Sequence, residues 1–200
     1  IDQACTRDLG LIVTSGDNFF SEEKRHATHE TTWLADGVPA FRLVNRCTEG
    51  RYRIEKEILT DPARPVLLQR TRFVALSGAP GDYRVHVLLA PHLANHGAGN
   101  TAWMGNHEGQ SMLFAERDGS ALALASSSGW LARSVGFVGV TDGWQDLVVH
   151  KQMTWHYDRA ENGNVAIMGE VRVPETDGTF MLALGFAIVD KEGAATLYLD

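Results

Sequence analysis

The sequence has no excess of basic residues, no long apolar run and only two cysteines, and each shortage argues against a class of protein. Eighteen Lys and Arg stand against 25 Asp and Glu, so there is no basic surface to neutralise a phosphate backbone, and we expect no nucleic-acid partner. No apolar stretch approaches the about 20 residues of a membrane span, so we expect no membrane partner. Cys5 and Cys47 lack the close spacing of a zinc or redox motif, and their separation neither requires nor excludes a disulfide.

The sequence also lacks an initiator methionine and a signal-peptide pattern, since it opens with Ile1-Asp2-Gln3. We therefore expect a piece of a longer chain, and localisation stays unknown. The 200 residues can bury a sizeable core, and no linker, internal repeat or low-complexity tract divides them. These features predict one domain over residues 1–200.

What the sequence does have is a regular supply of turn signals. Glycine recurs beside Asp, Asn, Glu or Ser, where a hairpin needs a residue that tolerates positive φ. The segments between these turns are short and alternate between apolar and polar residues with a period of two. Many strands at such spacing predict an all-β, antiparallel sandwich or barrel. The turn signals are Ser15-Gly16-Asp17, Asp36-Gly37, Glu49-Gly50, Asp118-Gly119, Asp142-Gly143, Asn162-Gly163 and Asp177-Gly178.

The clearest strand is 83–89, where Tyr83, Val85, Val87 and Leu89 share one face. Further strands are predicted at 112–115, 122–124, 153–157, 165–173 and 180–188. The one persuasive helix is short: Asp142 caps it, and Trp144, Leu147, Val148 and Lys151 follow at helical spacing. The residues expected inside are Leu11, Val13, Ile54, Val85, Val87, Leu89, Leu124, Val138, Ile167, Leu182 and Leu184.

Catalytic and metal motifs are not evident. His92, His96 and His107 fit no zinc-ligand spacing, so we expect neither a metal site nor a cofactor, and we expect His86 to be a sheet residue. A glycosidase needs two facing carboxylates, and no acidic pair stands apart from turns or charged clusters. Ser126-Ser127-Ser128-Gly129 lacks the pattern of a nucleophile elbow. We expect no catalytic residue in this segment.

Two segments depart from the alternating strand pattern. The loop 91–103 and the segment 139–147 gather glycine, polar amides and tryptophan, and long polar loops on a rigid sheet are where sites usually lie. Of the five tryptophans, only Trp103 and Trp144 lie beside such loops. If these segments face a partner domain or ligand, Asn95, Asn100, Trp103, Asp142 and Trp144 should lie near one edge of the sandwich. The alternative is that Trp103 and Trp144 are core residues on unrelated sides, since burial is the commoner fate of tryptophan.

Several strings resemble the N-terminal domain of the bacterial and archaeal glucoamylase and glucodextranase family. The matches occur in order along nearly the whole chain, and none of them is a catalytic fingerprint. They are Thr6-Arg7-Asp8-Leu9; Val44-Asn45-Arg46 with Glu49-Gly50-Arg51-Tyr52; Leu88-Leu89-Ala90-Pro91-His92-Leu93 with Asn95 and Asn100; Val138-Gly139-Val140 with Asp142-Gly143-Trp144-Gln145-Asp146-Leu147; Met153-Thr154-Trp155 with Tyr157-Asp158-Arg159-Ala160; and Leu182-Ala183-Leu184-Gly185-Phe186.

The resemblance implies an antiparallel super-β-sandwich with at most one or two short helices, which precedes an (α/α) barrel of paired helices in the same parent chain. In that family the barrel hydrolyses α-glucosidic bonds with inversion, using two glutamates that have no counterpart here. The resemblance therefore predicts a non-catalytic N-terminal domain that braces the barrel of a glycosidase parent. It leaves open whether the parent prefers α-1,4 or α-1,6 linkages and whether this domain touches an α-glucan.

Two other functions remain open at this stage. The chain could be a free-standing carbohydrate-binding module, in which exposed tryptophans stack on glucose units. It could also be a metal-dependent enzyme built on the loop histidines. Titration with maltooligosaccharides and isomaltooligosaccharides separates the first alternative from an accessory domain, and metal analysis of untagged protein tests the second.

Overall fold

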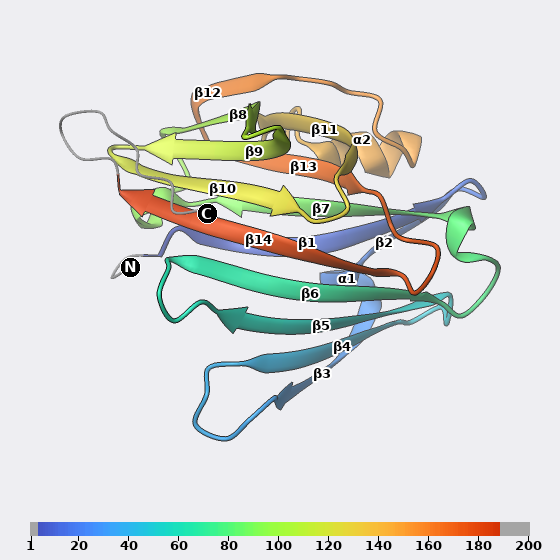
Figure 1. Ribbon diagram of the computed structural model, residues 1–200. Helices are drawn as coiled ribbons and strands as arrows, with labels where there is room; N and C mark the ends of the chain where they lie inside the picture. The colour runs from blue at the N-terminus through green and yellow to red at the C-terminus, as the bar shows by residue number, and fades with distance from the viewer. Residues whose placement is uncertain (1–3, 189–200) are drawn as a thin grey trace.

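Two antiparallel sheets of unequal width face each other in the computed structural model, which describes residues 4–188 (Figure 1). The wide sheet has nine strands in the order β12-β8-β9-β10-β14-β6-β5-β4-β3, and the narrow sheet has five in the order β11-β13-β7-β1-β2. The bounds are β1 (Thr6–Ser15), β2 (Phe19–Glu22), β3 (Ala27–Trp33), β4 (Phe41–Cys47), β5 (Tyr52–Thr60), β6 (Val66–Ala75), β7 (Tyr83–Pro91), β8 (Asn100–His107), β9 (Gln110–Arg117), β10 (Ser120–Ser126), β11 (Trp130–Phe137), β12 (Arg159–Gly163), β13 (Val165–Val171) and β14 (Thr179–Ile188).

Helical structure is sparse among residues 4–188. It comprises α1 (Glu23–His26), α2 (Gly143–His150) and two 3₁₀ turns, η1 (Pro80–Asp82) and η2 (Leu93–Asn95). No helix in this part of the chain is long and apolar enough to span a membrane. The all-β, antiparallel sandwich class predicted from the sequence is confirmed.

The core lies between the two sheets and is built from the alternating strand residues. Ten of the eleven residues predicted to be inside are buried there, as the period-two pattern requires. The exception is Val138, whose side chain is 40% exposed. Strand β11 ends at Phe137, whose carbonyl accepts hydrogen bonds from the backbone N–H groups of Val140, Thr141 and Asp142. Val138 therefore belongs to a surface turn and not to a strand.

The strand predicted at 153–157 is also wrong. The backbone N–H groups of Thr154 and Trp155 donate to Asp146 Oδ2, at 2.7 and 2.8 Å, and the N–H of Tyr157 donates to Ser134 Oγ. Side chains thus take the hydrogen bonds that a strand would give to a neighbour. The sequence reads as alternating, but the buried carboxylate of Asp146 holds the segment as an irregular loop after α2.

The predicted helix is confirmed as α2, which covers part of the outer face of the narrow sheet. Asp142 caps it, because Asp142 Oδ1 accepts from the backbone N–H of Gln145 at 3.0 Å. Leu147 packs with Ile12 and Met168 of the sheet beneath. A Cβ at Gly143 would overlap the Met168 side chain, so a glycine is needed for the helix to approach the sheet this closely.

A buried charge cluster supports the part of the wide sheet that α1 covers. Glu23, from α1, accepts hydrogen bonds from Lys56 Nζ, from Asn45 Nδ2 at 3.0 Å and from the backbone N–H of Leu11 at 3.0 Å. The Glu23 and Lys56 side chains are 7% and 4% exposed. Because each charge is buried with partners, removal of one would leave the other uncompensated.

We predict that Lys56→Met lowers the free energy of unfolding by about 3 kcal/mol, because the Glu23 carboxylate stays buried without its cation. Lys24→Met is the matched control, since Lys24 forms an ion pair with Asp8 at the surface and should change stability by no more than about 1 kcal/mol. Urea unfolding followed by circular dichroism measures both. Equal effects of the two substitutions would contradict the buried cluster.

Asp146 gives stability a dependence on pH. Burial alone raises the pKa of Asp146, but the side-chain hydrogen bond from Thr154, the backbone N–H groups of Trp155 and Thr154 and the His150 ring together outweigh burial, so the pKa lies below the ordinary value of 3.8. The folded state therefore binds the proton less readily than the unfolded chain does. This contribution to stability is present above the unfolded pKa and is lost as the pH falls through the folded pKa.

We accordingly expect Asp146→Asn to lower the free energy of unfolding by about 1–3 kcal/mol at pH 7, because an amide does not replace the carboxylate on all its donors. Below pH 4 the difference in stability from the wild type should shrink, because Asp146 of the unfolded wild-type chain takes up its proton before Asp146 of the folded protein does. Urea unfolding of both proteins between pH 2.5 and pH 7 measures this. A difference that stays constant over that range would show that the charge of Asp146 is not what matters.

Candidate functional site

A cavity of about 290 Å³ lies on the outer face of the narrow sheet, where α2 begins. Strands β1, β2, β7 and β13 form its floor, and the turn before α2 forms one wall. Basic, acidic and amide side chains mix in its lining with a few apolar ones. The lining residues are Arg7, Asp8, Glu22, Lys24, Arg25, Leu88, Ala90, His92, Val138, Gly139, Asp142, Trp144, Gln145, Asn164 and Ala166.

The wall beside α2 is fixed by Asp142 and Trp144. Asp142 is buried and also binds the backbone N–H of Gly139, so the turn and the helix start are held together. The Trp144 indole N–H donates to Glu22 Oε2 at 3.0 Å, and the Arg25 guanidinium lies 5.4 Å from the centre of the indole ring. Trp144 is therefore half-buried and held in place by β2 and α1.

A bulge in β1 turns the side chain of Arg7 toward the cavity. The pairing register between β1 and β7 shifts between Thr6 and Asp8, and such a bulge re-aims side chains, so Arg7 and Asp8 both line the cavity. Asp8 forms an ion pair with Lys24. Arg7 is exposed and has no hydrogen bond or ion pair with any residue of the described range 4–188. Its guanidinium donors are thus available to an incoming group.

His92 offers a second group without a partner. Its Nε2 atom is buried and makes no hydrogen bond with the described residues. Burial lowers the pKa of His92 below 6.5, and the nearby positive charge of Arg7 lowers it further. His92 is therefore neutral at pH 7, with a ring nitrogen that lacks a partner at the wall of the cavity.

The loop that carries His92 is shaped by Asn100. The fully buried Asn100 side chain accepts from the backbone N–H of Leu93 at 3.2 Å and donates to the carbonyls of His96 and Gly97 at 2.8 and 2.7 Å. Asn100 therefore organises the loop from within. Asn95 lies on the exposed part of the same loop, in a left-handed conformation with φ 61°.

The structure does not bring all five predicted site residues to one edge. Trp103 follows Ala102, which faces the core, so Trp103 points to the outer face of the wide sheet, where it stacks on Phe114 at 5.5 Å. Trp144 lies on the outer face of the narrow sheet. The shared surface expected for these two tryptophans is therefore wrong. Asp142 and Trp144 do line one cavity, and the loop of Asn95 and Asn100 reaches it through His92.

Other residues of the cavity escaped the sequence interpretation. Arg7, Glu22, Gln145 and Asn164 carry no motif that marks them as neighbours, and β1, β2, α2 and β13 bring them together only in the fold. One signal was available: Arg7, His92 and Gln145 each fall within a string that resembles the family. Three of those strings, at 6–9, 88–93 and 138–147, contribute to the lining.

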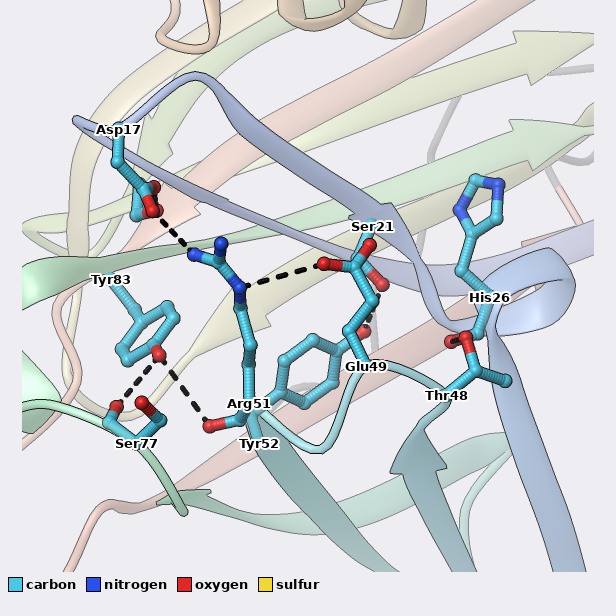
Figure 2. Close-up of polar contacts among 10 residues, drawn as sticks. Asp17, Ser21, His26, Thr48, Glu49, Arg51, Tyr52, Ser77 and Tyr83 are labelled. Carbon is cyan, nitrogen blue, oxygen red and sulfur yellow. Dashed lines mark hydrogen bonds and ion pairs between the residues drawn. The ribbon is translucent and has the colours of Figure 1, made fainter.

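A second polar cluster, at one end of the sandwich, is a structural one. Figure 2 shows Arg51, from the turn between β4 and β5, pointing toward Asp17, with an N–O distance of 2.6 Å, and toward Glu49, at 3.6 Å. The same guanidinium lies 4.4 Å from the centre of the Phe19 ring. These contacts join the turns at 15–18 and 48–51, and they occupy Arg51 within the chain.

The tyrosines of this cluster are engaged as well. The Tyr83 hydroxyl donates to the Ser77 carbonyl at 2.7 Å, and the Tyr52 hydroxyl lies 2.7 Å from Ser21 Oγ inside the core (Figure 2). Burial raises the pKa of Tyr52. Because these groups are satisfied internally, the cluster closes the end of the sandwich and offers little to a ligand.

The histidines do not form a metal site in the described residues. Among residues 4–188 there is no group of three or more His, Cys, Asp or Glu side chains placed to hold a metal ion. His86 is fully buried in the narrow sheet, where Nδ1 lies 3.3 Å from the carbonyl oxygen of Ile12. It is a sheet residue, as the sequence indicated.

The electrostatic coupling across the cavity is testable. We expect Arg7→Ala to raise the pKa of His92 toward 6.5, because it removes the neighbouring positive charge. Arg46→Ala is the control, since Arg46 is exposed on β4 of the other sheet. An NMR titration of the imidazole signals gives both values. A His92 pKa that is the same in the wild type and in Arg7→Ala would mean that Arg7 does not face the cavity.

Comparisons with known proteins match nearly the whole chain to one domain family. The family model for glucodextranase, domain N, matches residues 1–198. A glucoamylase from Clostridium sp. (strain G0005) is 35% identical over 96% of this chain and 27% of its own length. The crystal structure of a bacterial glucoamylase complexed with acarbose is also 35% identical and superposes with a TM-score of 0.90 over 96% of this chain and 28% of that one.

A more distant likeness concerns the fold alone. An inverting mannosidase of family GH92 from Bacteroides thetaiotaomicron matches 92% of this chain and 22% of its own, with a TM-score of 0.50 and 7% identity. Of the two glucoamylases described above, the chain spans little more than a quarter of the length of each. The family match, the identity and the superposition agree along nearly the whole chain: it belongs to the glucodextranase domain N family.

Proposed function

We propose that this chain is the non-catalytic N-terminal β-sandwich domain of a longer, glucoamylase-like glycoside hydrolase. In this proposal residues 1–200 belong to one domain, and a separate (α/α) barrel of the same parent chain hydrolyses α-glucosidic bonds of glucans with inversion. The observation that carries the proposal is the extent of the match, because 96% of this chain aligns with 27% of a glucoamylase. The remaining part of such a relative is long enough for a separate catalytic domain.

The acidic residues of the cavity support a non-catalytic role. Inverting hydrolysis needs an acid and a base that flank the scissile bond and are free to exchange protons with substrate and water. Asp8 is paired with Lys24, Glu22 accepts from Trp144 and pairs with Arg25, and Asp142 caps α2. Each carboxylate already has a structural task.

The same cavity suits contact with another domain. The Arg7 guanidinium has no hydrogen bond or ion pair among the described residues, so an incoming carboxylate or carbonyl would find donors there, and His92 Nε2 beside it also lacks a hydrogen-bond partner. The turn beside them exposes Val138 and Val140, the latter at 68%. Apolar side chains next to unpaired polar groups are typical of a surface that a partner covers. We assign this surface, with Asn95, Asn100, Asp142 and Trp144, to the contact with the barrel.

A free-standing carbohydrate-binding module has less support at Trp103 and Trp144, the two tryptophans beside polar loops. Sugar stacking needs an open aromatic face, but Arg25 lies over the ring of Trp144 and Phe114 covers one face of Trp103. Both rings are held within the chain, and Trp103 does not share the cavity. An accessory domain accounts for the same observations without a sugar site.

The function itself is tested with the parent enzyme and the 200-residue chain side by side. We expect the parent to release glucose from maltooligosaccharides or isomaltooligosaccharides with inverted anomeric configuration, which NMR detects directly. The chain alone should release none and should show no binding in calorimetric titrations with the same sugars. Hydrolysis by the chain alone would refute the non-catalytic role, and retained sugar affinity would favour the binding-module alternative.

The contact with the barrel is tested by substitution. We expect Trp144→Ala and Arg7→Ala to lower the thermal stability or the turnover of the parent enzyme, as expected where interface contacts are lost. The isolated chain should remain folded with either substitution. Arg46→Ala, on the outer face of the wide sheet, is the matched control and should leave the parent unchanged. If Trp144→Ala and Arg7→Ala behave like the control in the parent, the cavity is not part of the interface.

A further inference from the structure

The wide sheet extends beyond the narrow one. The narrow sheet ends at β2, whereas the wide sheet continues through β5, β4 and β3 to a free edge (Figure 1). In a sandwich each inner face is normally buried by the opposite sheet. The start of β5 and the end of β4 still belong to the core, where Cys47, Tyr52 and Ile54 are buried. The rest of the inner face of β3 to β5 has no covering sheet among the described residues, and α1 is the element that approaches it.

The exposure along one row of residues shows where the cover stops. Five inner-face residues lie opposite one another across β14, β6, β5, β4 and β3, namely Leu182, Gln69, Ile58, Phe41 and Trp33. Leu182 and Gln69 are buried under the narrow sheet, and Ile58 and Phe41 are half-buried. Trp33, at the edge, is 61% exposed. Burial thus falls steadily along one row, which is apolar from Ile58 to Trp33.

The next two rows of the same inner face are covered by α1. Lys56 lies in one of these rows and Asn45 in the other, and both are buried because Glu23, from α1, binds both. The short helix therefore closes the sheet next to the core but does not reach the row of Trp33. This leaves an apolar surface at the hairpin of β3 and β4, here called the overhang: Trp33, Leu34, Val38, Phe41 and Ile58.

The overhang has the composition of a contact surface. Trp33 and Phe41 lie 4.6 Å apart between ring centres, and Leu34 and Val38 are 42% and 47% exposed beside them. Aromatic side chains are enriched in the buried centres of protein interfaces. Strand β3 is also the edge of the wide sheet among the described strands, with no proline and only one acidic residue, and natural sheets usually protect such edges.

The course of the chain points to the occupant. Adjacent strands from β14 to β3 are antiparallel, so β14 ends at the same end of the sheet at which β3 ends and β4 begins. That is the end where the overhang lies. The two glucoamylases that match this chain each have about three-quarters of their length outside the match. We therefore expect the part of the same protein that lies outside this match to be the partner that covers the overhang.

We infer that the overhang is a docking surface for the part of the parent polypeptide outside these 200 residues, which covers Trp33, Phe41 and Ile58 and so completes the burial of the wide sheet. This inference rests on the proposed function, because it takes the chain to be one domain of a longer enzyme. It adds a second contact surface, formed by the other sheet, to the one at the start of α2.

Thiol labelling tests the inference in the full-length parent enzyme. Trp33→Cys and Val38→Cys place a thiol in the overhang, and Leu76→Cys places one at a site that is 50% exposed at the other end of β5 and β6. A maleimide reacts with each variant in native buffer, and peptide mass mapping follows the named site alone. We expect positions 33 and 38 to react at least about tenfold more slowly than position 76, because a covered thiol reacts only after local opening.

The other outcomes are equally informative. Equal rates at positions 33, 38 and 76 in the parent would overturn the inference. The 200-residue chain, labelled at low and high concentration, should react rapidly at all three positions. Slow labelling at 33 and 38 that appears only at high concentration would show that a second copy covers the overhang, which also overturns it. A parent that protects the overhang but hydrolyses no α-glucan would refute the proposed function alone.

Discussion

The constraint on which the structure depends is that two sheets of unequal width must bury their inner faces. Where the narrow sheet lies opposite the wide one, the alternating strand residues make a continuous apolar core. Next to β2 the sheet gives way to α1, and Glu23 binds Lys56 and Asn45 beneath it. Farther out no described residue covers the wide sheet, and the overhang begins. The buried charge cluster and the exposed aromatic row are therefore two consequences of the same mismatch.

The outer face of the narrow sheet is likewise covered only in part. Helix α2 and the loop after it cover Ile12 and Met168, and Asp146 holds helix and loop together through its hydrogen bonds to Thr154, Trp155 and His150. The helix covers only part of the sheet. The uncovered part is the cavity beside Asp142 and Trp144, where the Arg7 guanidinium and His92 Nε2 have no hydrogen-bond partner in residues 4–188. Incomplete cover on both sheets is what a domain built to contact another domain should show.

The sequence predicts the strands well because alternation records which face of a sheet is buried. It also predicts α2, because the cap at Asp142 and the helical spacing after it are local. It fails at 153–157 and at Val138, where apolar residues alternate but side chains of Asp146 and Ser134 or a tight turn take the backbone hydrogen bonds. Such partners lie outside the pattern of the segment itself.

The candidate site was predictable only in part for a related reason. Asn95 and Asn100 share a loop, and Asp142 and Trp144 share a helix start, so each pair could be recognised from local composition. Whether Trp103 joins them depends on which face of β8 it occupies and on which sheet β8 belongs to. Those are facts of strand order, and local composition does not encode them. Arg7 was hidden for the same reason, since only the bulge in β1 turns it toward His92.

The central claim is that this chain is a non-catalytic domain completed by the rest of a glucoamylase-like parent. The most direct measurement produces the 200-residue chain and the remaining part of the parent as separate polypeptides and mixes them. The account predicts that they associate, that the thermal stability of the catalytic part rises on mixing, and that glucose release from α-glucans resides in that part alone. No association, together with hydrolysis by the 200-residue chain, would contradict it.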